Sequence, residues 1–506
     1  MRFPKYLIQL FMMAVGLRRF GALRALDTIE EIPAWVPRLL RFFTFYIPRK
    51  LKLPDANGER LALALAAMGP AYIKLGQTLA TRPDLVGASI ADGLATLQDR
   101  LPAFAFSHVR ASIEDAFGGK LEDHFTSFDE KAVAAASIAQ VHKATTKDGS
   151  EAAVKVLRPD IEKRFTRDLA LFEWLAGIAE KYSPKAKRLK PGKIVEKIRE
   201  TVLQEMDLRL EGAAANELSG NMLGEEIYRI PAIVWDLTDQ RVLTLEWCDG
   251  IRLSDRPALR AAGHDLPALG DTIVQTFLTQ ALRDGYFHAD LHQGNLLVEP
   301  SGGIVAIDFG IMGRLTKLER RFLAEILYGF IKRDYRRVAE LHFDAGFVPM
   351  TESLEDFTRA LKAIADPILD LPIEEISAGK LLAQLFATTD KFNMQTQPQL
   401  LLLQRTMVMA EGMALHLNPQ ANMWKISEPV IEEWMRENLS PEVRLADLIN
   451  QIPRFVERLP AFLEKMMNDP VPASAPTPVI IKQSAGIWPF AFGLIAGAAI
   501  LKILVL

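Results

Sequence analysis

The stretch of sequence that decides the fold is His288-Ala289-Asp290-Leu291-His292-Gln293-Gly294-Asn295, followed shortly by Ile307-Asp308-Phe309-Gly310. Between them, the apolar residues 296–298 and 304–307 flank Gly302-Gly303, which predicts two short strands joined by a tight turn. Such a hairpin carries Asn295 before its first strand and Asp308 after its second, so both side chains could meet at one end and share a metal ion. Asp290 lies just upstream, where it could hold an attacking group. Together these three side chains predict phosphoryl transfer.

The alternative is a turn-rich loop whose acids are coincidental, but two motifs at this spacing are far more specific than a lone Asp-Phe-Gly tripeptide. The same residues resemble the catalytic loop and the DFG segment of the protein-kinase superfamily. That resemblance implies a kinase-like fold that uses ATP and Mg²⁺.

Composition narrows the class of protein. A chain of 506 residues is too long for one ordinary core, so two or more domains or lobes are expected. The formal net charge of -3 is near balance, and nucleic acid is therefore not an implied partner. Cys248 is the only cysteine, which excludes an intrachain disulfide and a cysteine-rich metal site and fits a reducing compartment.

The N-terminal region is basic. Residues 1–52 hold ten Lys or Arg against three acids, and the short apolar run 7–17 is followed at once by Arg18-Arg19. No small-residue cleavage site follows the run, so a signal peptide is disfavoured. We expect an interfacial helix on anionic membrane lipid. The alternative is an apolar helix that docks on the body of the protein.

From about residue 121 the pattern changes to strands. A small-residue loop, Ala134-Ala135-Ala136-Ser137, is followed by a strand, a hairpin turn at Lys147-Asp148-Gly149 and a second strand at 151–159 that carries Lys155. This order is typical of a kinase N-lobe that covers a nucleotide. Glycines normally occupy the loop, so that backbone N–H groups can approach phosphates. Lys155 is the candidate for the α- and β-phosphates, and an ordinary strand-edge lysine is the alternative.

Residues 160–225 are helical by pattern and contain a basic cluster that either faces solvent or faces anionic lipid. Glu211 could pair with Lys155 across the N-lobe. The long separation of these two residues implies an insertion between the strand and the helix that carry them. Residues 241–250 predict a strand that runs into an interlobe hinge, where backbone groups near Glu246 to Cys248 would meet adenine.

The C-terminal part begins with a helical C-lobe, expected over residues 251–465. A Pro-rich stretch then predicts a semi-rigid linker over 466–486. Residues 487–506 are almost wholly apolar and would span roughly 30 Å as a helix, the thickness of one bilayer core. Lys502 lies close enough to the end to reach the far interface. A transmembrane anchor is therefore predicted, with a buried tail helix as the alternative.

With these residues in view, the chain resembles the UbiB family of atypical kinase-like proteins, which is linked to ubiquinone biosynthesis. The resemblance covers roughly residues 55–340. It rests on four motifs: Lys74-Leu75-Gly76-Gln77 (KxGQ), Ala134 to Ser137 (the Ala-rich loop), Glu205-Met206-Asp207 (ExD), and Asp290 to Asn295 with Asp308.

The resemblance changes the interpretation of the first motif. Taken alone, Lys74 and Gln77 are best explained as a solvated helix edge. In the family, the KxGQ helix lies over the nucleotide pocket and contacts ExD. The resemblance therefore implies a regulatory role for Lys74, Gly76 and Gln77, with Lys74 near Glu205 and Asp207. It also implies ATPase activity with Mg²⁺ and suppressed protein-kinase activity.

The expected fold is α+β and two-lobed, with a helical extension before the kinase-like part. We expect a basic, membrane-surface helical region at 1–54, the KxGQ extension at 55–120, a kinase-like N-lobe with a helical insert at 121–250, a C-lobe at 251–465, a linker at 466–486 and a transmembrane anchor at 487–506. The resemblance implies the bacterial inner membrane with a cytoplasmic catalytic domain. Expected partners are phenolic polyprenyl lipid intermediates, anionic membrane lipids, other ubiquinone-biosynthesis proteins and a second copy of the chain.

Three functions compete at this point. The first is a membrane-tethered ATPase that acts on or presents polyprenyl-phenol intermediates. The second is a small-molecule or lipid kinase, which the KxGQ helix disfavours. The third is a non-catalytic lipid-binding scaffold, which the full set of phosphate and metal residues disfavours. An older interpretation of bacterial members as hydroxylases has no support, since neither a flavin-binding GxGxxG segment nor a metal-oxygenase triad is visible in the sequence.

Overall fold

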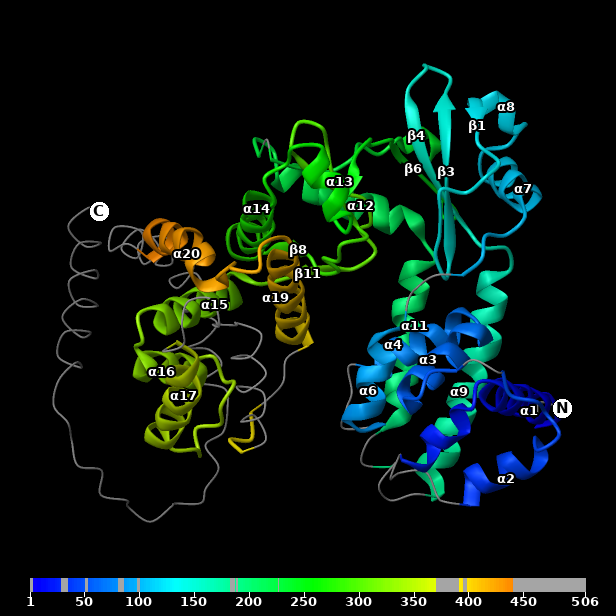
Figure 1. Cartoon of the computed structure of the whole chain (residues 1–506), viewed down its shortest axis with the longest axis horizontal. Helices are drawn as coiled ribbons and strands as arrows, with labels where there is room; N and C mark the ends of the chain where they lie inside the picture. Colours follow the sequence, from blue (N-terminus) through cyan, green and yellow to red (C-terminus); the bar gives the residue numbers. More distant parts are fainter. Residues whose placement is uncertain are drawn as a thin grey trace, which may run out of the picture. The chain divides into compact units, whose positions relative to one another are not determined.

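A five-stranded antiparallel sheet carries Lys155 in the computed structural model, which describes residues 3–28, 35–50, 53–80, 86–97, 101–182, 187, 190–225, 227–369, 391–394 and 398–439. Its strands are β1 (Phe125–Phe128), β2 (Ala134–Ala135), β3 (Ala139–Thr146), β4 (Glu151–Leu157) and β6 (Val242–Glu246). The order is β1-β3-β4-β6, with β2 paired to β3 (Figure 1). The predicted turn joins β3 to β4, and Gly149 takes the positive φ of 89° there.

The alternation of side chains along β4 explains where Lys155 lies. Val154 and Val156 are fully buried in a cluster with Val109 and Ile113 of α7 (Phe106–Phe117). The short helix α8 (Leu121–His124) adds Leu121 to this cluster. Because successive side chains of a strand point to opposite faces, Lys155 lies on the other face of the sheet. That is the face on which α12 (Leu208–Asn221) packs.

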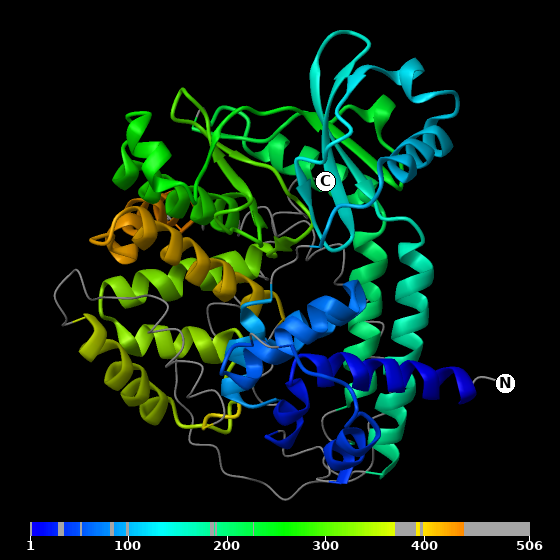
Figure 2. The same cartoon turned by 45° about the vertical axis from the view of Figure 1, so that its right-hand side comes forward.

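The predicted insertion between β4 and α12 is a helical hairpin, formed by α9 (Ile161–Tyr182) and α11 (Pro191–Glu205) (Figure 2). The helical pattern does not continue unbroken into α12. The chain leaves helical geometry at Met206 and Asp207, and the Asp207 side chain accepts a hydrogen bond from the Arg209 N–H to cap α12. Glu205 and Glu211 therefore belong to different helices.

The N-terminal elements pack on this hairpin and on each other. They are α1 (Phe3–Arg19), η1 (Ala22–Asp27), α2 (Trp35–Phe43), α3 (Asn57–Met68), α4 (Pro70–Ala80) and α6 (Ala88–Ala95). A glycine pair lets α3 and α6 approach closely, since a Cβ atom on Gly93 would lie 2.4 Å from the Gly58 Cα. The helix α4 carries the KxGQ motif and contacts both α9 and α11 (Figure 2).

The kinase-like C-lobe contains two smaller sheets. One has the order β5-β10-β9-β7, from β5 (Tyr228–Arg229), β10 (Ile304–Ala306), β9 (Leu296–Val298) and β7 (Ile251–Arg252). The other pairs β8 (Tyr286–His288) with β11 (Met312–Arg314). The predicted hairpin is confirmed, because β9 and β10 are antiparallel and Gly302 has a φ of 91° in the turn between them.

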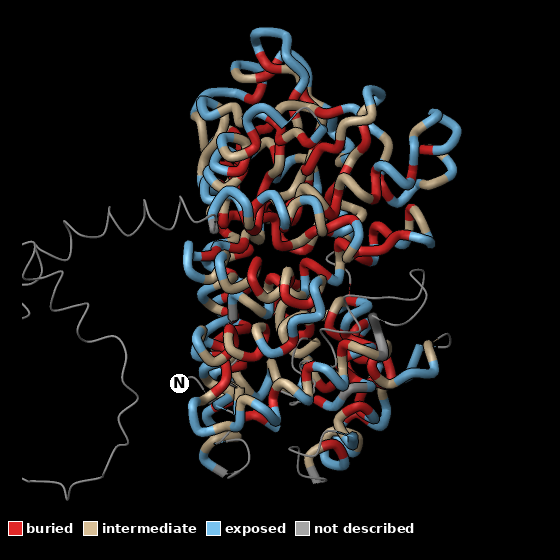
Figure 3. The backbone as a smooth tube through the Cα atoms, turned by 90° about the vertical axis from the view of Figure 1, so that its left-hand side faces the viewer, coloured by how far each residue is buried: buried red, intermediate tan, exposed pale blue. Residues whose placement is uncertain are grey.

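Further helices follow β5 along the chain, and Figure 3 shows buried residues running through the interior. They are η2 (Trp235–Leu237), α13 (Arg256–Ala261), α14 (Leu266–Thr279), the π-helical turn η3 (Gln280–Asp284), α15 (Lys317–Ile331), α16 (Tyr335–Asp344), α17 (Leu354–Leu369), α19 (Pro398–Leu417) and α20 (Met423–Leu439). Phe330, Val338 and Phe357 form the centre of a core that joins α15, α16 and α17.

The membrane anchor remains a prediction. No helix among the described ranges is both long and apolar enough to cross a bilayer. The predicted linker at 466–486 and the predicted span at 487–506 lie outside the described residues. Residues 1–437 form one compact unit, to which all the sheets belong.

Candidate active site

The hairpin brings the three predicted acidic and amide side chains to one end of β9 and β10. The Ile307 N–H donates to the Asn295 carbonyl oxygen at 3.0 Å, which places Asp308 beside Asn295. The Asn295 amide Nδ2 donates to the Asp290 carbonyl at 3.2 Å and lies 3.4 Å from its carboxylate. The structure therefore brings the side chains of Asp290 and Asn295 together and holds the backbone before Asp308 against Asn295.

Lys155 lies between two carboxylates. Its Nζ is 2.6 Å from Glu211 Oε1 and 3.6 Å from Asp308 Oδ2. The Lys155 and Glu211 side chains are 13% and 8% exposed, whereas that of Asp308 is 42% exposed. The Phe309 N–H also lies 3.5 Å from Glu211 Oε1, so Glu211 contacts both the lysine and the segment that carries Asp308. The predicted Lys155–Glu211 pair is present.

Charge and burial set the ionisation of this group. Burial opposes the charge on Lys155, but the carboxylates of Asp308 and Glu211 outweigh it and raise the lysine pKa above its ordinary value. Partial removal from water raises the Asp308 pKa, but the positive charge of Lys155 outweighs this effect and holds that pKa below its usual range. Burial, assisted by repulsion from Asp308, raises the pKa of Glu211 against the attraction of Lys155. The positive charge of the Lys155 ammonium group thus offsets the repulsion between the Glu211 and Asp308 carboxylates.

His288 connects the two motifs, a role that the sequence pattern did not assign. Its ring is fully buried; Nε2 lies 2.5 Å from the Asp308 carbonyl oxygen, and Nδ1 accepts from the Asp290 N–H at 3.2 Å. Since Nδ1 accepts, the neutral ring carries its proton on Nε2 and donates it to Asp308. Burial lowers the His288 pKa, which favours this neutral form.

Two further side chains support the catalytic loop from distant parts of the chain. Gln280, in the π-helical turn η3, accepts the His288 N–H through its side-chain oxygen at 3.1 Å. The fully buried Thr406 of α19 lies with its hydroxyl 3.2 Å from the Ala289 carbonyl oxygen. In the sequence, the one hint of a role for Gln280 is that it is a polar residue in an apolar helical stretch. Nothing in the sequence marks Thr406.

The Ala-rich loop is held by hydrogen bonds to β3 and to the side chain of Arg158. Ala134 and Ala135 form β2, and the Ala136 N–H donates to the Ala139 carbonyl at 2.8 Å. Arg158 donates to the Ala136 carbonyl from Nε at 3.2 Å and from its terminal nitrogen at 2.8 Å. Ser137 is fully buried, and its Oγ has no hydrogen-bond partner among the described residues. The loop therefore offers one unsatisfied buried hydroxyl.

Of the two acids of the ExD motif, Glu205 makes the predicted contact with Lys74 of KxGQ, and Asp207 does not. Lys74 Nζ is 2.8 Å from Glu205 Oε1, and the two side chains are only 14% and 9% exposed. Asp207, in contrast, pairs with Arg209 at 2.7 Å and caps α12. Gly76 has a packing role, because a Cβ atom there would lie 2.5 Å from Leu97 and 2.8 Å from Leu65. Gln77 lies on the same helix, partly exposed.

In the predicted hinge, the side chain of Glu246 forms an ion pair with Arg229. It pairs with Arg229 at 2.8 Å, and Arg229 also contacts Glu299 at 2.6 Å and the Cys248 sulfur at 3.3 Å. The backbone N–H groups of Glu246 and Trp247 are used by Ala232 and Glu151. The Cys248 N–H has no backbone partner among the described residues. Of the three hinge amides, Cys248 is thus the one that a ligand can use.

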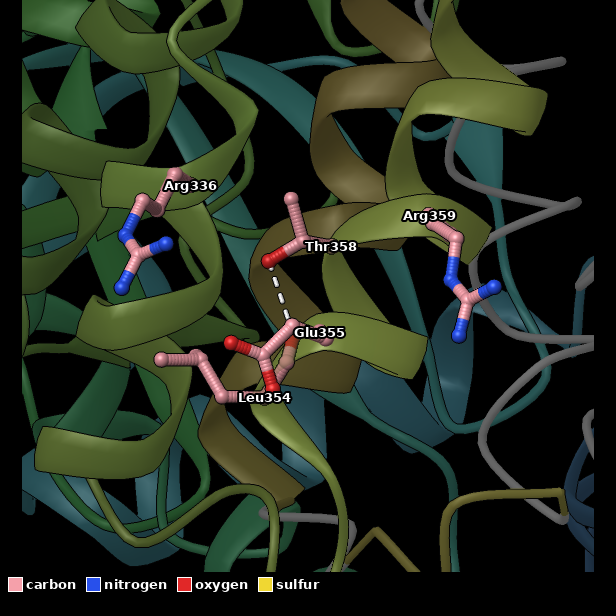
Figure 4. Close-up of a pocket in the computed structure, with 5 residues that line it drawn as sticks. All are labelled: Arg336, Leu354, Glu355, Thr358 and Arg359. Carbon is pink, nitrogen blue, oxygen red and sulfur yellow. Dashed lines mark hydrogen bonds between the residues drawn. The ribbon is translucent and has the colours of Figure 1, made fainter.

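A hollow lies between α16 and α17 (Figure 4). It has a volume of about 270 Å³ and is lined by Arg336, Leu354, Glu355, Thr358 and Arg359. Arg336 pairs with Glu340 and Arg359 pairs with Asp356, so both cations are already neutralised within their own helices. None of the predicted site residues lines this hollow.

The donor set at the hairpin fits a nucleotide-bound Mg²⁺. That ion usually takes one or two protein oxygen ligands and completes its shell with phosphates and water. The Asn295 amide oxygen remains after its nitrogen binds Asp290, and the Asp308 carboxylate is partly exposed. No group of three or more His, Cys, Asp or Glu side chains in the described part of the chain could hold a metal by itself.

The sequence resembles known proteins over most of its length. Residues 96–342 match the ABC1 atypical kinase-like domain, and residues 361–422 match the UbiB helical domain. The chain is 41% identical over 445 residues to "Probable protein kinase UbiB" of Aeromonas salmonicida (strain A449), covering 86% of this chain and 81% of that protein. The protein of the same description from Pseudomonas paraeruginosa (strain DSM 24068 / PA7) is 39% identical over 486 residues, covering 94% and 90%.

A solved structure supports the fold. The complex of Rv3197 with erythromycin from Mycobacterium tuberculosis superposes with a TM-score of 0.52 at 23% identity, covering 72% of this chain and 93% of that one. The α+β kinase-like fold preceded by N-terminal helices is therefore confirmed, and a kinase-like domain implies nucleotide binding. The chain belongs to the UbiB family of ABC1 atypical kinase-like proteins.

Proposed function

We propose that this protein is a Mg²⁺-dependent ATPase that serves ubiquinone biosynthesis at the bacterial inner membrane. The observation that carries the proposal is the position of Lys155 between Glu211 and Asp308, with Asn295 and Asp290 adjacent. These are the types of side chain that phosphoryl transfer uses to hold Mg-ATP. The name of the curated relatives, "Probable protein kinase UbiB", supports the link to phosphoryl transfer and to the pathway.

Each residue has a defined task in this proposal. Lys155, oriented by Glu211, donates hydrogen bonds to the α- and β-phosphates. Asn295 and Asp308 would hold Mg²⁺ through their side-chain oxygens. Bound Mg-ATP supplies the transferable phosphoryl group and disperses its charge. Asp290 accepts a hydrogen bond from the attacking water or hydroxyl and orients it. Positioning and charge stabilisation provide most of what this chemistry requires.

The remaining predicted site residues contact the nucleotide. We assign the adenine edge to the free N–H of Cys248, beside Glu246, and the phosphates to the loop of Ala134, Ala135, Ala136 and Ser137. The unpartnered Ser137 hydroxyl supports this assignment, because a buried hydroxyl without a partner is costly unless a ligand satisfies it.

Water rather than a protein hydroxyl is the proposed acceptor. The nearly buried pair Lys74–Glu205 joins α4 to the end of α11, directly before α12. In this proposal Lys74, Gly76, Gln77, Glu205 and Asp207 regulate access to the site, and α4 occupies the surface where a protein substrate would bind. The protein would then act on or present phenolic polyprenyl lipids, together with other proteins of the pathway.

The test is ATP turnover by an Asp290→Asn variant. Amide substitution keeps the shape and the contact with Asn295 but removes the acceptor for the proton, so phosphate release should fall by at least a hundredfold. Nucleotide affinity, measured by equilibrium binding, should change little. Asp160→Asn, an exposed acid outside the site, is the matched control. Undiminished turnover in Asp290→Asn would remove the assignment.

Two alternatives give different products. A small-molecule or lipid kinase would yield a phosphorylated phenolic lipid, detectable by mass spectrometry, in place of free phosphate. A non-catalytic scaffold would bind nucleotide without hydrolysis even in the presence of membranes and a phenolic quinone precursor.

A further inference from the structure

The end of α2 and the turn after it form an exposed aromatic surface. Phe42 and Phe45 are 70% and 71% exposed, and Phe43, Tyr46 and Leu39 are 56%, 59% and 44% exposed. The opposite side of this segment is anchored, since Thr44 is fully buried with its hydroxyl 2.6 Å from the Leu40 carbonyl oxygen. Four large aromatic side chains directed at water within five residues are unusual for a soluble surface and mark an interaction site.

Arginines from four different elements gather beside this surface. They are Arg18 of α1, Arg24 of η1, Arg41 of α2, Arg49 after the aromatic turn, and Arg60 of α3. The Arg18 guanidinium reaches the Phe45 carbonyl oxygen at 3.5 Å, and the Arg60 side chain lies over Gly21. We call these five residues the arginine cluster.

The arginine cluster is poorly neutralised. Between described residues it contains one ion pair, from Arg41 to Asp27, while Arg24 and Arg49 have none. Burial lowers the Arg49 pKa, and so does repulsion by Arg18, Arg24, Arg60 and Arg41. The described residues thus gather positive charge beside the aromatic surface, which suits an anionic partner.

From the combined geometry we infer that α2, its aromatic turn and the arginine cluster dock onto an anionic phospholipid membrane. Aromatic side chains prefer the interfacial zone, where apolar atoms meet headgroups, and arginines bind the phosphates of the same layer. A free phosphate would leave the aromatic surface unexplained. A second copy of this surface would bring two positive clusters together, so self-association is disfavoured.

This inference rests on the proposed membrane location and adds α2 and its aromatic turn to the contact that the sequence pattern predicts for α1. The sequence pattern points to the apolar run of α1, whereas the structure places the most exposed aromatics on α2 and the following turn. α1 also exposes Ile8 and Met12, at 65% and 62%, but Phe11, its exposed aromatic side chain among the described residues, is 40% exposed.

A single fluorophore can report the docking. Cys248 is buried, and burial raises its pKa to about 11, so a thiol introduced at the surface can be labelled selectively. We would label Phe42→Cys with an environment-sensitive dye in the full-length protein. The protein would be reconstituted into phosphatidylcholine vesicles, with or without phosphatidylglycerol. The matched control carries the dye at Met350→Cys, a position that is 83% exposed in the C-lobe.

The expected result is a blue shift and a rise in emission at position 42 in the anionic bilayer only, with no change at position 350. The double variant Arg24→Glu, Arg49→Glu should shift the docking equilibrium by about 25-fold or more toward the undocked form, since each basic residue lost changes it about fivefold. Lys163→Glu, with a side chain that is 84% exposed elsewhere, should have no effect.

Three outcomes would overturn the inference: a water-like dye at position 42 in the anionic bilayer, an equal response in neutral vesicles, or indifference to the two charge reversals. A response without vesicles that grows with protein concentration would assign the surface to self-association instead. The fluorescence needs no ATP turnover. If the unaltered protein docks but hydrolyses no ATP, the proposed function is contradicted and this inference still stands.

Discussion

Lys155 shows how one charge can determine both stability and chemistry. Lys155→Met removes the cation that compensates the nearly buried Glu211 and the adjacent Asp308. Breaking a buried pair in this way costs several kcal/mol, so the free energy of unfolding should fall by about 3 kcal/mol. Denaturant unfolding measures this loss. Lys143→Met, which breaks the exposed pair with Glu151 on the neighbouring strand, is the control and should cost far less. Equal losses would contradict the prediction.

His342 predicts a pH dependence of stability. Its ring is buried on α16, its Nδ1 lies 2.7 Å from the Val338 carbonyl oxygen, and burial lowers its pKa to about 4. The unfolded chain takes up the proton first as the pH falls below about 6.5. Stability should therefore decline by about 3 kcal/mol between pH 6.5 and pH 4 and then level off. His342→Phe should remove this slope in unfolding curves recorded across the range; identical slopes in both proteins would refute the assignment.

At the scale of elements, the pairing of β8 with β11 depends on one glycine. A Cβ atom on Gly313 would lie 2.1 Å from the ring of Phe287, its partner across the two strands. That ring is fully buried against Phe277 and has no room to move. Gly313→Ala should lower the melting temperature and cost about 3 kcal/mol. Gly177→Ala, on the exposed side of α9 with nothing within 4 Å, should instead stabilise by up to about 1 kcal/mol. A harmless Gly313→Ala would show that β8 and β11 can separate.

Elements near the catalytic loop could be predicted where the information is local. The hairpin that carries Asn295 and Asp308 follows from residues adjacent in sequence, and the Lys155–Glu211 pair follows from the kinase-like order of strands. The support from Thr406 could not be predicted, since its contact with Ala289 joins residues 117 positions apart and no pattern marks a single threonine. The sequence pattern does not predict the break before α12, because it stays helical through Asp207. In the structure, Asp207 caps α12.

For the whole molecule, the pair Lys74–Glu205 joins the N-terminal helices to the inserted hairpin over a separation of 131 residues. Because both side chains are nearly buried, a double-mutant cycle of Lys74→Ala and Glu205→Ala should give a coupling free energy of about 2 kcal/mol in denaturant unfolding. The exposed pair Lys163–Asp160 should show no measurable coupling in the same assay. Additive effects at Lys74 and Glu205 would mean that α4 is held by its apolar packing alone.

The attachment of the Ala-rich loop bears on how long a product stays bound. Opening of the loop requires the Val133–Val141 and Ala136–Ala139 backbone hydrogen bonds to break. It also breaks the hydrogen bonds that Arg158 donates to the carbonyl oxygens of Ala136 and Pro102. A nucleotide beneath such a loop leaves no faster than the loop opens. We therefore expect slow opening of this loop to lengthen the residence time of ADP, which leaves the nucleotide-bound form available to a lipid partner after each turnover.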